Sequence, residues 1–361
     1  MTENKWGTCP YFLLKGNINR RLLEVRVIMQ SDIEYIDEIS NILRKEITDE
    51  NSIHKLTTEL LRGAESGLEL EDSFKNWIRN RFEYQFIWLD NDDYLKALVR
   101  ALWLAPVFAG TDFGGSRQRD MAQVWTDTAR GFLGEIAVLK FLLNKFDVRI
   151  TLDTKRGELT KFLPTDITNI KLPYEDWRKP NLNISIKTTK FNGRWLDVPG
   201  KQFDHSDIFI LVKIGISRHH FLAFLKAISF LRDKLFARAS SLGELDNEEA
   251  NHLWNEIPEF NPIPAYVAGY VCKKDVNLPI HEIFCRRKGT KNIRIAITQG
   301  IGLFSPQTLR KEPKIYCIDK NESLPIEIEP IIESLTNVHF LAHSGGLKWG
   351  KENWKSLIDL I

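Results

Sequence analysis

Two apolar segments, NLNISIKTTK (residues 181–190) and DIFILVKIGI (residues 207–216), decide the fold. Both are short, rich in Ile and Val, and bounded by Gly, Pro, Asn or Asp, which is typical of β-strands. VRITLD (residues 148–153) and AYVAGYVC (residues 265–272) have the same character. Between them, FLAFLKAISFLRDKLFARA (residues 221–239) has the length and apolar periodicity of a helix. A helix among strands predicts a mixed α/β core.

The chain before these strands has a different pattern. From Asp32 to Leu143 the apolar residues recur at helical spacing, so this third should be largely helical. The polar, acidic stretch 240–264 ends in Pro and is expected to be a surface excursion, and the stretch 339–361 should end in a helix. We therefore expect three regions: a mainly helical N-terminal region (1–125), an α/β core (126–300) and a C-terminal extension packed on the core (301–361).

Composition narrows the class of protein but does not identify it. Of 361 residues, 43% are hydrophobic and 27% charged, as in ordinary globular proteins. The net charge of +2 does not by itself mark a nucleic-acid binder. The four cysteines form no CxxC pair, which argues against structural zinc and favours reduced, intracellular thiols. No apolar window reaches the roughly 18 residues of a membrane span, so we expect a cytoplasmic protein.

A single acid lies in an otherwise apolar helical segment. GFLGEIAVLKFLL (residues 131–143) carries Glu135 among Phe, Leu, Ile and Val. Burying an unpaired carboxylate is costly, so Glu135 should meet a metal, a cation or a hydrogen-bond donor. The alternative is a solvated carboxylate at the edge of an amphipathic helix.

An aspartate and a lysine follow on strand-like segments. Asp166 lies in FLPTDITNI (residues 162–170), and Lys187 follows 21 residues later. That spacing allows a turn and a return strand beside Asp166. Because strand side chains alternate, Asn183, Ser185 and Lys187 should share one face, with Ile184 and Ile186 on the other. Two acids and one lysine meet the needs of phosphodiester hydrolysis, which uses a divalent cation on hard oxygen ligands and a nearby ammonium group.

The order of these features resembles a known family. A helix with GE, then P-x-D-I, a strand ending in I-K and a further strand DIFILVKI resemble the PD-(D/E)xK nuclease superfamily, especially type II restriction endonucleases, over about 90 residues. The resemblance implies a restriction-endonuclease-like mixed sheet flanked by helices. It also implies that Asp166 binds Mg²⁺ (with Mn²⁺ as a substitute), that Lys187 positions the attacking water, and that Glu135 assists. Ile186, through its main chain, would be a further metal ligand.

One position departs from the family pattern. Two residues before the lysine the family usually has Asp or Glu, whereas this chain has Ser185, which supplies no anionic ligand. Some restriction enzymes resemble this arrangement, with the acid donated from elsewhere. Glu135 is the first choice for that donor, and Ser185 would then orient a metal-bound water through its hydroxyl. The other candidate donors are Asp197, Asp204 and Asp207.

Basic residues gather in three short segments and are candidate contacts to DNA phosphates or bases. A solvated surface role is an equal or better explanation for each of them. They are Lys190 and Arg194 after the lysine strand, Arg117 and Arg119 in GGSRQR, and Arg286, Arg287 and Lys288 in FCRRKGTKNIRI.

The resemblance implies an Mg²⁺-dependent endonuclease that cuts double-stranded DNA at a specific sequence, as in restriction–modification, in a bacterial or archaeal cell. A homodimer on a palindromic site is expected, because both strands must be cut. The absence of GxxxxGK[ST] predicts no nucleotide cofactor. One alternative is a nuclease of the same fold in phage defence or repair without sequence specificity. Another is a catalytically inactive DNA-binding protein, which the serine at position 185 keeps open.

Overall fold

The computed structural model describes residues 36–62, 76–111, 120–153, 165–217, 219–275 and 339–361, together with four strand backbones between 280 and 325. Among the candidate DNA contacts, Arg117, Arg119, Arg287 and Lys288 lie outside the described residues. For Arg286 only the backbone, in a strand, is described.

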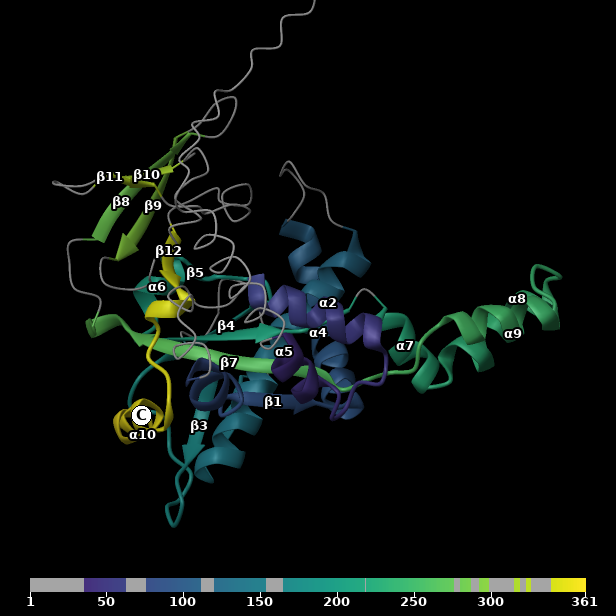
Figure 1. Ribbon diagram of the computed structural model, residues 1–361, viewed down its shortest axis with the longest axis horizontal. Helices are drawn as coiled ribbons and strands as arrows, with labels where there is room; N and C mark the ends of the chain where they lie inside the picture. Colours follow the sequence, from purple (N-terminus) through teal and green to yellow (C-terminus); the bar gives the residue numbers. More distant parts are fainter. Residues whose placement is uncertain are drawn as a thin grey trace, which may run out of the picture.

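A four-stranded mixed sheet forms the centre of the protein (Figure 1). Its strand order is β1 (Phe86–Leu89), β7 (Ile263–Cys272), β6 (Ile208–Ile214) and β4 (Ile184–Lys190). β4 and β6 run parallel, and the other two pairings are antiparallel. Every residue of β6 and β7 is buried. The expected α/β fold with a mixed sheet flanked by helices is therefore confirmed.

Each face of this sheet has its own hydrophobic core. On one face, Ile184 and Ile186 of β4 and the even-numbered residues of β6 pack under helices. These helices are α4 (Asn91–Thr111), α5 (Met121–Phe146) and α10 (Lys351–Leu360). On the other face, Phe209 and Leu211 of β6 pack against the helix at 36–43, α2 (Glu50–Arg62) and the π-helix η1 (Trp77–Phe82). The sheet is thus a middle layer.

Two further sheets extend this arrangement. The six-stranded sheet has the order β11 (Ser323–Pro325), β10 (Ile315–Ile318), β8 (Ile280–Arg286), β9 (Asn292–Thr298), β12 (His339–His343) and β5 (Trp195–Pro199). Leu196 and Val198 of β5 and Phe340 of β12 join the second core. The hairpin of β2 (Arg149–Leu152) and β3 (Ile167–Lys171) lies between α5 and β4 in the sequence.

The remaining helices follow β5 and β6. The short helix α6 (Gly200–His205) connects β5 to β6. After β6 come α7 (His220–Ala227), the π-helix η3 (Leu231–Phe236), α8 (Ala237–Ser241) and α9 (Asn247–Glu256), and the last three form a projection at the right of Figure 1. Short 3₁₀ turns, η4 (Lys273–Asp275) and η7 (Ser344–Gly346), follow β7 and β12.

Several details differ from the sequence expectations. In the described part of the N-terminal third, the chain is mainly helical, and β1 pairs with β7 in the central sheet. The expected boundary at residue 125 falls inside α5. The expected surface excursion 240–264 contains α9, which starts with a capping box between Asp246 and Glu249. The expected helix 221–239 is interrupted near Ser229, whose φ is 59°. The C-terminal helix is confirmed as α10.

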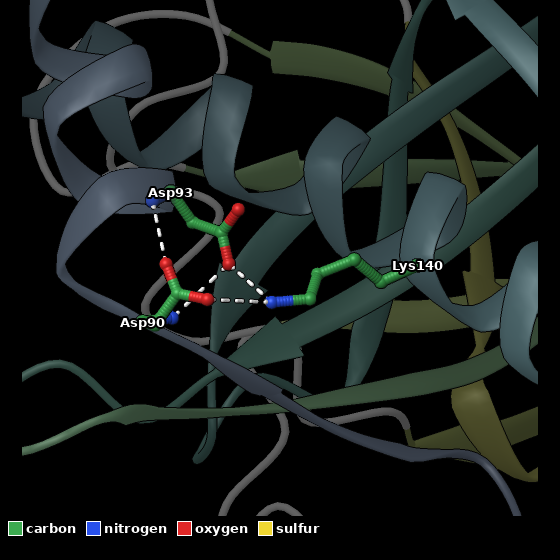
Figure 2. A network of polar contacts seen from close by, with 3 residues as sticks. All are labelled: Asp90, Asp93 and Lys140. Atoms are coloured by element: carbon green, nitrogen blue, oxygen red, sulfur yellow. Dashed lines mark hydrogen bonds and ion pairs between the residues drawn. The ribbon is translucent and has the colours of Figure 1, made fainter.

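A polar network fixes α4 against α5 (Figure 2). The Lys140 ammonium on α5 lies 2.5 Å from a carboxylate oxygen of Asp93 and 3.1 Å from one of Asp90. Each aspartate also accepts a hydrogen bond, at 3.0 Å, from the backbone N–H of the other. Burial would raise the pKa of Asp90, but the backbone N–H of Asp93 and the Lys140 charge outweigh it and lower that pKa. The network holds the helix that carries Glu135.

The contact of α5 with β4 depends on a glycine. A Cβ at Gly134 would lie 1.9 Å from the Oγ1 of Thr188 on β4. Thr188 Oγ1 also donates a hydrogen bond to the carbonyl of Gly131, at 3.3 Å. Only a residue without a side chain lets the helix approach the strand this closely.

We expect Gly134→Ala to lower the free energy of unfolding by about 1–3 kcal/mol, because the added methyl group overpacks the helix–strand contact. Gly131→Ala is the matched control, since a Cβ there meets nothing within 4 Å. It should leave stability unchanged or raise it by up to about 1 kcal/mol through helix propensity. Urea unfolding measures both, and equal stabilities for the two variants would contradict the close approach.

Candidate active site

Asp166 is anchored to the open edge of β4. Its backbone N–H donates to the carbonyl of Ile184 at 2.7 Å, and its own carbonyl accepts from the N–H of Asp153 at 2.9 Å. Its carboxylate accepts a hydrogen bond from the N–H of Ile186 at 2.5 Å. Main-chain and side-chain bonds thus fix the carboxylate against the strand that carries Lys187.

Lys187 is directed away from α5. Ile184 and Ile186 are buried in the core under α5, whereas Ser185 and Lys187 pair in register with Phe209 and Leu211 of the opposite core. The expected alternation of faces along β4 is confirmed. The Lys187 ammonium donates to Oε1 of Gln202 on α6 at 2.5 Å.

Glu135 shares the environment of these residues. Desolvation by burial raises its pKa well above the ordinary glutamate value, and the negative charges of Asp166 and Asp153 raise it further. The positive charges of Arg100 and Lys187 act in the opposite direction. Glu135 is partly buried, and these contributions favour a desolvated carboxylate over one at a solvated helix edge.

The pKa values of Asp166 and Lys187 respond to the same surroundings. Burial raises the pKa of Asp166, while Lys187, the N–H of Ile186 and the Ser185 side chain lower it in part. Burial lowers the pKa of Lys187, while Asp166, Asp197 and Glu135 act to raise it. Asp166 and Lys187 therefore interact electrostatically with each other and with Glu135, although the pairing of β4 places Lys187 on the face of the sheet away from α5.

Ser185 supports the Asp166 carboxylate. Its side chain is buried and hydrogen-bonds to Asp166, which favours the ionised form of that carboxylate. Ser185 thus helps to hold the Asp166 carboxylate in place.

The three other acids considered as donors are distributed differently. Asp197 on β5 is close enough to Lys187 to raise its pKa. Asp207 accepts a hydrogen bond from the N–H of Asn183 at 2.9 Å, at the start of β4. Asp204 is exposed on α6.

Three residues of this neighbourhood were not expected from the sequence. Asp153 follows β2 and is brought beside Asp166 by the β2–β3 pairing. Arg100 on α4 interacts electrostatically with Glu135. The buried Nη1 of Arg100 has no hydrogen-bond partner among the described residues. Gln202 contacts Lys187 from α6. None belongs to a sequence motif; each depends on tertiary packing.

The donor set is small. Within the ranges that the structure describes, no three or more His, Cys, Asp or Glu residues are grouped so that they could hold a metal ion. The nearby carboxylates of Glu135 and Asp166 remain as hard oxygen donors. Mg²⁺ is commonly bound through one or two carboxylates while it keeps several waters, so these two acids fit that cation.

The candidate DNA contacts near the site are on the chain that leaves β4. Lys190 is exposed at the end of the strand. Arg194 is partly exposed, and its carbonyl accepts a hydrogen bond from Ser344 at 2.8 Å. A role of either residue in DNA binding stays a prediction.

Comparison with known proteins gave no match, either to a family model or to a curated protein or solved structure. Among the described residues, no helix has the length and apolar character needed to cross a membrane.

We expect the desolvation of Glu135 to make the free energy of unfolding depend on pH. A raised folded-state pKa means that the folded protein holds the proton more tightly, so stability falls as pH rises above the ordinary value of about 4.3. Glu135→Gln cannot ionise and escapes this loss. Its free energy of unfolding should therefore exceed that of the wild type at pH 8, by a margin that shrinks toward pH 4.

Denaturant unfolding across this pH range measures the difference. Glu352→Gln, at an exposed residue of α10, is the control and should change stability by less than about 1 kcal/mol. Parallel pH profiles for the wild type and Glu135→Gln would show that Glu135 is not desolvated.

Proposed function

We propose that this chain is a Mg²⁺-dependent endonuclease that hydrolyses phosphodiester bonds of double-stranded DNA. The observation that carries the proposal is that main-chain hydrogen bonds hold Asp166 against the strand of Lys187, and that both residues interact electrostatically with Glu135. Groups with strongly shifted pKa values cluster at functional sites, which supports a catalytic role for these three residues. The order of these residues in the sequence resembles the PD-(D/E)xK nucleases.

The two carboxylates supply a place for the cation. Asp166 and Glu135 repel each other in a poorly solvated environment, and a bound divalent ion would relieve that repulsion. The main chain at Ile186 lies beside the Asp166 carboxylate, because the Ile186 N–H donates a hydrogen bond to it. When bound there, Mg²⁺ would lower the pKa of a coordinated water and offset charge on the phosphate.

The protein's own groups have distinct tasks in this scheme. Lys187 orients the attacking water and places positive charge near the phosphate. Gln202 restrains the lysine, since it accepts a hydrogen bond from its ammonium group. Ser185 and the N–H of Ile186 keep Asp166 in one orientation. Such preorganisation reduces the rearrangement needed at the moment of reaction.

Plasmid cleavage tests the proposal. Purified protein should convert supercoiled plasmid to cut forms with Mg²⁺ or Mn²⁺ and should be inactive with a chelator. We expect Lys187→Ala to lower the cleavage rate at least about 100-fold, because it removes the cation next to the phosphate, while DNA binding in a mobility-shift assay persists. Lys171→Ala, at the end of β3, is the matched control and should cleave as the wild type does.

The products distinguish the proposed function from its alternatives. Discrete fragments support cleavage at a specific sequence, as in type II restriction enzymes, and a smear supports a nuclease without specificity. A mobility shift without cleavage by the wild type under all metal conditions would contradict the nuclease and favour an inactive DNA-binding protein.

A further inference from the structure

A helical arm, defined as residues 230–257, extends from the body of the protein. The helix that precedes the arm, α7, is well packed: its Phe224 lies in the central core and contacts the ring of Tyr94. Beyond Ser229 the chain leaves through η3 and α8 and returns through α9. Figure 1 shows this arm at the right, away from the central sheet.

Internal contacts make the arm a preformed element. The ring of Trp254 on α9 lies under the charged groups of Lys226, at 5.1 Å, and Arg232, at 4.4 Å. Leu231 and Phe236 are buried, and the capping box of Asp246 and Glu249 fixes the start of α9. The arm therefore needs little ordering before it contacts a partner.

The arm leaves large apolar side chains in solvent. Single exposed apolar residues are ordinary, but several on one projecting element supply apolar area that a partner could bury. Five such side chains, each 41–60% exposed, lie at its base and along it: Ile228, Phe230, Leu235, Leu242 and Leu253.

Charge on the arm is divided between its two halves. The outgoing half, η3 and α8, carries Arg232, Lys234 and Arg238 with one acid, Asp233. The returning half and its entry turn carry five acids and no Lys or Arg: Glu244, Asp246, Glu248, Glu249 and Glu256. Each arm is thus basic along one half and acidic along the other.

We propose that the arm is a self-association surface that docks against the arm of a second copy of this chain. A twofold axis pairs a surface with itself, so it requires a self-complementary patch. The arm meets that requirement, because the basic half of one copy would face the acidic half of the other, with the exposed apolar side chains buried between them. A second copy carries both complementary halves on the same element, so its arm can match both.

The inference does not rest on the nuclease assignment. If both hold, self-association through the arms would place two active sites in one particle, one for each DNA strand. The oligomeric state and plasmid cleavage are measured separately, so failure of one can be distinguished from failure of the other.

Sedimentation velocity of the full chain over the micromolar range tests the proposal. The wild type should form a dimer, and Leu235→Glu combined with Leu242→Glu should weaken dimerisation at least about 10-fold, because each change places a charge in the apolar contact. Leu360→Glu, at an exposed leucine of α10, is the matched control and should dimerise as the wild type does. Far-ultraviolet circular dichroism verifies that each variant is folded.

Charge reversal identifies the partner as a second arm. Lys234→Glu with Arg238→Glu should weaken the dimer, and so should Glu248→Lys with Glu256→Lys, because each pair places like charges opposite each other. All four changes together should restore it. A wild type that stays monomeric throughout, or a dimer that none of these changes affects, would overturn the proposal.

Discussion

The hydrogen bond from the Ile186 N–H to the Asp166 carboxylate is the interaction on which the site depends, together with the bond from the Asp166 N–H to the Ile184 carbonyl. The two bonds use main-chain groups on the open edge of β4, which would otherwise need water or another strand. They fasten the chain that enters β3 to β4, one residue from Lys187. The acid and the lysine are therefore neighbours because of main-chain pairing, and not because of their mutual attraction.

The third member of the site depends on helix packing. Glu135 follows Gly134, whose lack of a side chain allows α5 to approach Thr188. Five residues further along the same helix, Lys140 joins α5 to Asp90 and Asp93 at the start of α4 (Figure 2). Because interiors are close-packed, these two contacts limit both the depth and the rotation of the helix. The position of the Glu135 carboxylate follows from them.

The sequence predicted those features that depend on local pattern. Runs of Ile and Val marked β2, β4, β6 and β7, but the four residues of β1 become a strand only through pairing with β7. The capping box of α9 was readable as Asp246-x-x-Glu249 and was missed because the acidic composition suggested a loop. Glu135, Asp166 and Lys187 were proposed as site residues from their order in the sequence. Asp153 and Arg100 were not, because strand register and helix packing bring them to the site.

The electrostatic balance at the site favours binding over stability. Two acids in a desolvated place cost folding free energy, and a structure selected for stability alone would have apolar residues there or would pair each acid with a close cation. Here Lys187 instead donates to the neutral amide of Gln202, which leaves its charge available, and Nη1 of Arg100 is buried without a hydrogen-bond partner among the described residues. Positive and negative groups are thus kept near each other without full mutual neutralisation. Such an arrangement is suited to a ligand that carries both charges, as a phosphate with its divalent counterion does.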